Sequence, residues 1–107
     1  MNILTIESAT DIELISISTG RENFQFVRET GLSHSTGMFG NISSLIKEAG
    51  ISISDIDLLG VGTGPGSFTG IRIAVSTARM FSQILSVPLV GVKSHEIYAA
   101  SFSAKAE

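Results

Sequence analysis

The amino-acid sequence predicts an α/β domain built on a mixed five-stranded sheet, with the element order βββαβαβ(α). The amino-terminal part of the chain alternates apolar and polar residues and is interrupted by short polar turns, as strands of a meander are. The part that follows alternates segments of helical spacing with short apolar runs, which is typical of parallel strands joined by helical crossovers. A chain of 107 residues has room for one such domain, which we expect to span residues 1–107.

The first three strands are expected close together, over residues 2–7, 12–18 and 24–28. In the third of them, Phe24, Phe26 and Arg28 share one side, so the other side would face water. The turns between these strands are short and polar, which favours an antiparallel meander.

The first helix is expected over Thr36–Ala49, because its apolar residues recur with helical spacing. The stripe consists of Met38, Phe39, Ile42, Leu45, Ile46 and Ala49. Ser35 or Thr36 is the expected N-cap, and Gly50 is the expected stop.

After this helix the chain is expected to turn at Ser54 and then to alternate strand, helix, strand and helix. These elements are predicted over residues 57–62, 70–85, 87–92 and 94–102, with Ser94 capping the last helix. The complete order is that of the ribonuclease-H-like, or actin-like ATPase (ASKHA), half-domain.

The composition excludes several classes of function. The chain has no cysteine, which removes disulfides, thiolate catalysis and cysteine-ligated zinc, and which fits a reducing cytoplasm. Its net charge is −3 and its lysines and arginines are scattered, so a chain that grips nucleic acid alone is disfavoured. The amino terminus lacks a basic segment, and no apolar run is long enough to cross a bilayer, so we expect neither a signal peptide nor membrane insertion.

The stretch GTGPGSFTGIRIA (residues 62–74) concentrates four of the eleven glycines and allows three interpretations. A phosphate site would use free amides at a helix start, but Ile71 follows Gly70 where a P-loop has lysine, and the glycine spacing misses the dinucleotide fingerprint by one residue. A nucleophile is disfavoured, because Ser67 lies outside a G-x-S-x-G elbow. The third interpretation is a rigid turn, with positive φ at Gly64 and Gly66 and with Ser67 or Thr69 capping the helix. A phosphate contact would fall on Gly64, Gly66, Ser67, Phe68, Thr69, Gly70 and Arg72.

The helix after this stretch is apolar over roughly 200° of its circumference, whereas a helix that rests on one sheet needs only about 100°. Its polar strip is narrow and comprises Arg72, Ser76, Arg79 and Gln83. We therefore expect a second neighbour for this helix, either another helix or a second chain. A line of small residues on the earlier helix (Gly37, Gly40 and Ser44) is consistent with close approach of another backbone, although Gly37 can equally lie at a frayed start.

At these residues the chain resembles the TsaB (YeaZ) family, whose signature is G-x-GPGSFTG-[LIV]-R-[IV]. The resemblance extends to MNILTIESAT at the start, to LSHS (residues 32–35), to SDIDLLGVG (residues 54–62) and to VPLVGVKSHEIYA (residues 87–99). It implies a cytoplasmic protein of the actin-like ATPase superfamily that serves the formation of N6-threonylcarbamoyladenosine at position 37 of tRNAs reading ANN codons.

The resemblance implies a scaffold rather than a catalyst. TsaB members pair with the paralogue TsaD, which transfers the threonylcarbamoyl group, while TsaE supplies ATPase activity; tRNA is reached only through the complex, and TsaB also forms homodimers. We therefore expect no catalytic residue and no cofactor, with ATP bound only in complex with partners. The expected partner surface comprises Gly37, Gly40, Ser44, Ile73, Ala74, Thr77, Ala78, Met80 and Phe81.

Four features depart from the pattern of the family or of related kinases. Glu7-Ser8 stands where members commonly have Asp-Thr, and His95 stands where they usually have leucine. The turn that contains Asp11 has no glycine, which argues against nucleotide binding there. Members are also about twice as long, so we expect the carboxy-terminal half-domain to be absent.

Two other functions remain open. An ATP-dependent phosphotransfer enzyme of the same superfamily would need an acidic residue for Mg²⁺, and Glu7 or Asp11 could serve. A free-standing tRNA-binding module is disfavoured by charge. No metal site is expected, because His34 and His95 are far apart in sequence and share no carboxylate at ligand spacing.

Overall fold

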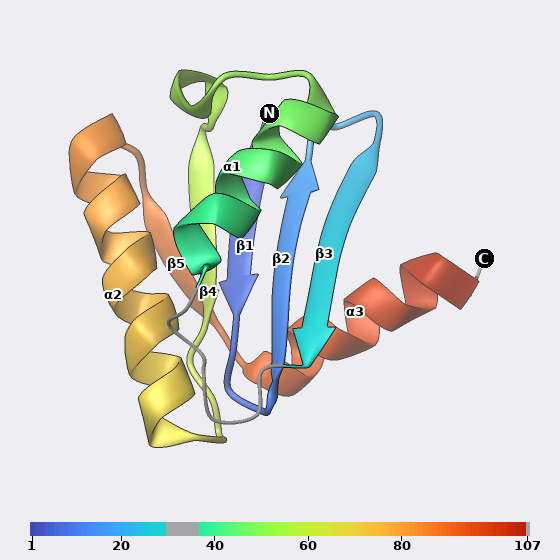
Figure 1. The fold of residues 1–107 in the computed structure, drawn as a ribbon, viewed down its shortest axis with the longest axis vertical. Coiled ribbons are helices and arrows are strands. Elements are labelled where there is room, and N and C mark those ends of the chain that lie inside the picture. Colours follow the sequence, from blue (N-terminus) through green and yellow to red (C-terminus); the bar gives the residue numbers. More distant parts are fainter. Residues whose placement is uncertain (30–36, 107) are drawn as a thin grey trace.

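The computed structural model describes the backbone of residues 1–29 and 37–106, and the side chains of this part up to residue 100 (Figure 1). The elements follow one another as β1 (Ile3–Glu7), β2 (Ile12–Ser18), β3 (Asn23–Glu29), α1 (Met38–Ala49), a 3-10 turn (Ile53–Asp55), β4 (Leu58–Gly62), α2 (Phe68–Leu85), β5 (Leu89–Val92) and α3 (Ser94–Ala106). The predicted order of elements is confirmed.

The five strands form one mixed sheet in the order β3-β2-β1-β4-β5. The β1–β2 and β2–β3 pairs are antiparallel, whereas the β1–β4 and β4–β5 pairs are parallel. Parallel pairing brings the carboxyl ends of β1, β4 and β5 to the same edge of the sheet, at the bottom of Figure 1. In open α/β sheets this edge is where functional sites form.

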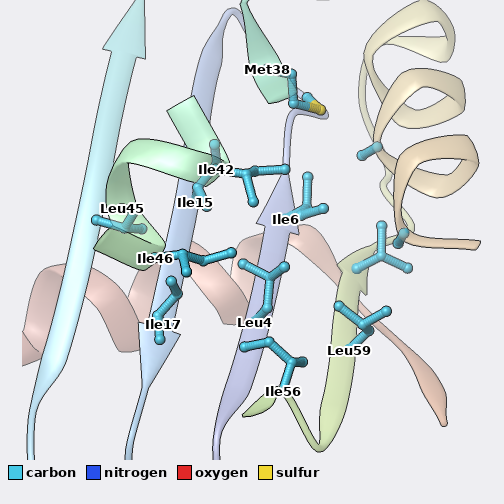
Figure 2. Packing of buried hydrophobic residues seen from close by; sticks show 13 residues of the cluster. Leu4, Ile6, Ile15, Ile17, Met38, Ile42, Leu45, Ile46, Ile56 and Leu59 are labelled. Atoms are coloured by element: carbon cyan, nitrogen blue, oxygen red, sulfur yellow. The ribbon is translucent and has the colours of Figure 1, made fainter. Parts of the chain in front are cut away.

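The main core lies between the sheet and the two helices α1 and α2, which lie on the same face (Figure 1). Figure 2 shows Ile42 and Ile46 of α1 pointing at Ile15 and Ile17 of β2. All four side chains belong to one buried cluster. The alternation predicted for β2 and the stripe predicted for α1 thus meet, except that Phe39 of the stripe is 51% exposed.

Helix α2 packs on the same face through its smallest side chains. Gly70, Ala74 and Ala78 are buried, and the two alanines belong to the core cluster. Small side chains let the helix axis approach the sheet closely. Helix α3 crosses the opposite face at the lower edge of the sheet (Figure 1).

A partly buried ion pair fixes the start of α1 against the sheet. The carboxylate of Glu13 in β2 has no exposed surface and lies 3.6 Å from the guanidinium of Arg28 in β3. The side-chain amide of Asn41 in α1 donates to the other oxygen of Glu13 at 3.1 Å. The three residues link β2, β3 and α1. This agrees with the prediction that Arg28 shares the inner side of β3 with Phe24 and Phe26.

Several element ends differ from expectation. Helix α1 begins at Met38 with Gly37 at the N-cap in a left-handed conformation (φ 83°), and the predicted caps Ser35 and Thr36 lie outside the described residues. Gly50 is confirmed as the stop, with φ 73°. The turn before β4 is capped by Ser52, in a reciprocal capping box with Asp55, and does not begin at Ser54. Reciprocal side-chain caps of this kind satisfy amides that the turn leaves unpaired.

Candidate functional site

Three segments converge at the lower edge of the sheet: the turn after β1, the glycine-rich loop (residues 62–70) between β4 and α2, and the start of α3. The backbone N–H of Ser67 donates to the carbonyl oxygen of Ala9 at 2.5 Å. The hydroxyl of Ser8 donates to the carbonyl of Gly70 at 2.7 Å. These two bonds join the first hairpin to the first turn of α2.

The glycines of this loop serve different physical purposes. Gly64 has φ 94°, as predicted, and a side chain there would be strained. Gly66 is not in the left-handed region, so the predicted positive φ is wrong for it. A Cβ on Gly66 would overlap the carbonyl of Ala9, and a Cβ on Gly62 would overlap the carboxylate of Glu7. Close approach of the first hairpin therefore explains both glycines.

Several backbone amides of the loop are engaged within the chain. Ser67 is the N-cap of α2, as predicted, and its hydroxyl accepts from the N–H of Gly70 at 3.3 Å. The N–H of Gly64 donates to the hydroxyl of Ser94 at 2.9 Å. Ser94 is the first residue of α3 and binds Gly64, so its predicted role as the cap of α3 is wrong. The amides of Gly64, Ser67 and Gly70 are therefore not free to bind a phosphate.

Glu7, the last residue of β1, is fully buried in the middle of this convergence. One carboxylate oxygen accepts from the N–H of Ala9 at 2.5 Å. The other oxygen has no hydrogen-bond partner within the described part of the chain. The sequence did not distinguish this buried carboxylate from an exposed one, and the signal that could have found it is Gly62 on the adjacent strand, which leaves the space that Glu7 fills.

Tyr98 of α3 closes the other side of the first hairpin. Its hydroxyl donates to the carbonyl of Ile12 at 3.0 Å and lies 2.9 Å from the hydroxyl of Thr10. Burial raises the pKa of Tyr98 to about 12, and the negative charge of Glu7 adds to the increase. Together with Ser94, Tyr98 anchors the first turns of α3 to the hairpin and to the glycine-rich loop.

A second candidate site is the surface formed by α1 and α2. Ile73, Met80 and Ile84 follow one another on α2 at intervals of seven and four residues and so form one stripe. Ile84 is 69% exposed, and the ring of Phe39 on α1 lies 5.8 Å from that of Phe81 on α2. We call the surface made by Phe39, Ile73, Met80, Phe81 and Ile84 the α1–α2 face.

The predicted partner residues on α2 differ in how much of their surface is exposed. Ala74 and Ala78 are fully buried against the sheet, so their prediction as partner contacts is wrong: they have no surface left to offer. Ile73, Met80 and Phe81 are half-buried, and Thr77 is almost buried.

The line of small residues on α1 is exposed to solvent. Gly37 precedes the helix, and its positive φ accounts for glycine there, so it is not a tolerated helix-interior glycine. Gly40 and Ser44 are exposed, and a Cβ on Gly40 would meet no atom of the described residues within 4 Å. A partner contact at Gly40 and Ser44 stays a prediction.

Three residues of the predicted loop set, Phe68, Thr69 and Arg72, are exposed on the first turns of α2. The guanidinium of Arg72 lies 5.6 Å from the centre of the Phe68 ring, a cation–π arrangement. His95 is exposed on α3, whereas His34 lies outside the described residues. Within the described ranges, no three histidine or acidic side chains gather as metal ligands would. No helix in that part of the chain combines the length and apolarity needed to span a membrane.

Comparisons with known proteins identify relatives of the chain. A sequence model of the family "TsaD: tRNA N6-adenosine threonylcarbamoyltransferase" matches residues 28–107. The "tRNA threonylcarbamoyladenosine biosynthesis protein TsaB" of Escherichia coli is 30% identical over 97 residues, which are 88% of this chain and 41% of that protein. The protein of the same name from Bacillus subtilis is 29% identical over 104 residues, 94% of this chain and 44% of that protein.

Among solved structures, YeaZ from Pseudomonas aeruginosa superposes with a TM-score of 0.82 at 25% identity, covering 87% of this chain and 45% of that chain. The match confirms the predicted ribonuclease-H-like, or actin-like ATPase, fold. The chain thus spans less than half the length of the relatives it matches. The chain belongs to the TsaD family and, within it, to the TsaB (YeaZ) proteins.

Proposed function

We propose that this protein takes part in forming N6-threonylcarbamoyladenosine in tRNA as a non-catalytic subunit that pairs with a TsaD-type paralogue. The observation that carries the pairing is the α1–α2 face, on which Phe39 and Ile84 keep more than half of their surface exposed. Contiguous exposed apolar surface marks an interaction site, because covering it removes about 25 cal/mol per Å² of unfavourable hydration. The names of the E. coli and B. subtilis relatives support the pathway.

The glycine-rich loop supports a scaffold role. Its amides at Gly64, Ser67 and Gly70 are used within the chain, and the carboxylate of Glu7 fills the space between the loop and the first hairpin. A phosphate placed there would meet a buried negative charge. We therefore propose that the chain contributes surface and rigidity, that catalysis and tRNA contact belong to its partners, and that it works in the cytoplasm.

Co-elution of the full-length protein with the TsaD paralogue of the same organism, with and without TsaE and nucleotide, tests the pairing. Ile84→Glu should abolish co-elution, because a carboxylate would enter the apolar contact, whereas Gln83→Glu adds the same charge to the exposed polar strip and should have little effect. Light scattering of each variant alone reports any homodimer. If the unmodified proteins fail to co-elute, the proposed pairing is wrong; if Ile84→Glu still co-elutes, the surface is wrong.

The alternative is an ATP-dependent phosphotransfer enzyme of the same superfamily, in which Glu7 or Asp11 would hold Mg²⁺. Calorimetry with ATP and Mg²⁺ on the full-length protein separates the two proposals. Tight binding without any partner would favour the enzyme. Binding only in the presence of the TsaD paralogue agrees with ATP being held by the complex.

A further inference from the structure

We propose that a hollow on the amino-terminal half of α2 receives an acidic side chain of the partner protein. This inference rests on the proposed function, since it specifies the chemistry of the surface that the partner presents. The hollow has a volume of about 330 Å³ and is lined by Thr69, Arg72, Ile73, Ser76 and Thr77. Ligand pockets range from about 300 to 1,000 Å³, so this one suits a side chain better than a large cofactor.

The lining has the chemistry of a carboxylate site. Its lining residues carry one guanidinium, on Arg72, and three hydroxyls, on Thr69, Ser76 and Thr77. A guanidinium binds a carboxylate through two parallel hydrogen bonds, and hydroxyls can donate to the remaining lone pairs. Ile73 belongs both to the hollow and to the α1–α2 face, so the acidic group would sit at the border of the apolar contact.

Arg72 is partly oriented for this task. Its guanidinium lies over the Phe68 ring, which restricts the side chain before a partner arrives. Restricting a side chain beforehand lowers the entropy that binding must remove. Thr77, at 7% exposed, is held by the packing of α2 on the sheet and so presents its side chain from a fixed position.

The charges of the helices point to a different chain as the occupant. Helix α2 carries Arg72 and Arg79 and no acidic residue, and α1 carries a single acid, Glu48, in its last turn. Contact between two copies of α2 would therefore bring arginine toward arginine. A partner with carboxylates beside an apolar anchor complements this surface, and the apolar stripe beside the hollow favours a protein over an RNA backbone.

The affinity of the full-length protein for the TsaD paralogue, measured by calorimetry at fixed salt, tests the proposal. Arg72→Glu should weaken binding at least about tenfold, and Arg72→Lys should keep part of the affinity. Thr77→Val, which keeps the shape and removes the hydroxyl, should weaken binding a few-fold. Arg79→Glu is the matched control, because Arg79 is exposed on the same polar strip but outside the hollow, and should change affinity by less than about threefold.

Four other results would overturn the carboxylate site, and one of them would overturn the pairing as well. If the unmodified protein binds and Arg72→Glu binds as well as Arg79→Glu does, the carboxylate site is wrong while the proposed pairing stands. If the unmodified protein does not bind, the pairing and this proposal both fall. Retention of bulk tRNA that both arginine variants abolish would make the strip a nucleic-acid surface and would overturn the proposal. Self-association that is lost in Arg72→Glu and restored by adding Glu48→Lys would assign the hollow to a second copy, and the proposal would be wrong.

Discussion

Replacing Gly66 by alanine should destabilise the domain, because the glycine-rich loop lies directly against the first hairpin. The added Cβ would overlap the carbonyl oxygen of Ala9 and would lie 2.8 Å from its Cβ and 2.9 Å from its carbonyl carbon. These are atoms of the backbone or attached to it, so they cannot rotate away and the hairpin or the loop must shift. The backbone conformation of Gly66 is open to alanine, so the effect is steric.

The expected loss has two contributions. Overpacking costs about 1–3 kcal/mol, and the shift would break the 2.5 Å bond between the N–H of Ser67 and the carbonyl of Ala9, worth about 0.5–1.5 kcal/mol. We expect Gly66→Ala to lower the free energy of unfolding by about 2–4 kcal/mol, measured by urea denaturation followed by circular dichroism.

Gly40→Ala is the matched control. In the part of the chain that the structure describes, nothing lies within 4 Å of a Cβ at this position, which is in the first turn of α1. Alanine should leave stability unchanged or raise it by up to about 1 kcal/mol, because helices favour alanine over glycine. If Gly66→Ala unfolds at the same urea concentration as Gly40→Ala, the close contact between loop and hairpin does not exist. The loop would then not join the first hairpin to α2 in the way described.

Two further predictions concern the buried polar groups. Tyr98 is the single tyrosine and there is no tryptophan, so the ultraviolet absorbance of phenolate reports it alone; it should titrate near pH 12 in the folded chain and near 10 after denaturation. Because the pKa of Tyr98 is higher in the folded chain, the stability that comes from burying its neutral hydroxyl is present below pH 10 and is lost as the pH rises toward 12. Titration of Tyr98 near pH 10 in the folded chain would contradict its burial. Arg28→Met leaves the Asn41 amide as the remaining described partner of the fully buried Glu13. The free energy of unfolding should fall by about 2–3 kcal/mol, less than the roughly 3–5 for a fully buried pair, because the Arg28 side chain is 35% exposed. Urea denaturation checks the value, and an unchanged midpoint would show that the ion pair contributes nothing.

The sequence predicted the fold well because each element has one clear period. The alternation in β2 and the stripe in α1 each indicate a single face, and these faces meet in the core. Helix α2 was harder, because an apolar arc of roughly 200° does not say which part faces the sheet. Ala74 and Ala78 take that position, since small side chains allow the closest approach, and the larger Ile84 is left outside.

The site was less predictable than the fold, because it depends on contacts between distant segments. Glu7 and Gly62 are far apart in sequence but lie on the neighbouring strands β1 and β4, and neither residue alone indicates that one fills the space left by the other. The same holds for Ser94, whose hydroxyl looks like a helix cap in the sequence but accepts from Gly64 in the fold. Local sequence patterns predict where helices start and which face of a strand is buried. The hydrogen bonds at this edge of the sheet join residues that are distant in sequence, so local patterns do not predict them.

The signature stretch can be divided by what the fold itself requires. Gly62, Gly64 and Gly66 are explained by close contacts or positive φ, and Ser67 by capping α2. Phe68, Thr69 and Arg72 are exposed on the first turns of α2, and none of these contacts or caps explains them. Phe68 is 74% exposed, which leaves a large apolar ring in water where the fold gains little from it. The packing of the domain accounts for the glycines but not for these three side chains. Contact with another molecule is therefore the better explanation for them, and that contact would be made at the hollow beside Arg72.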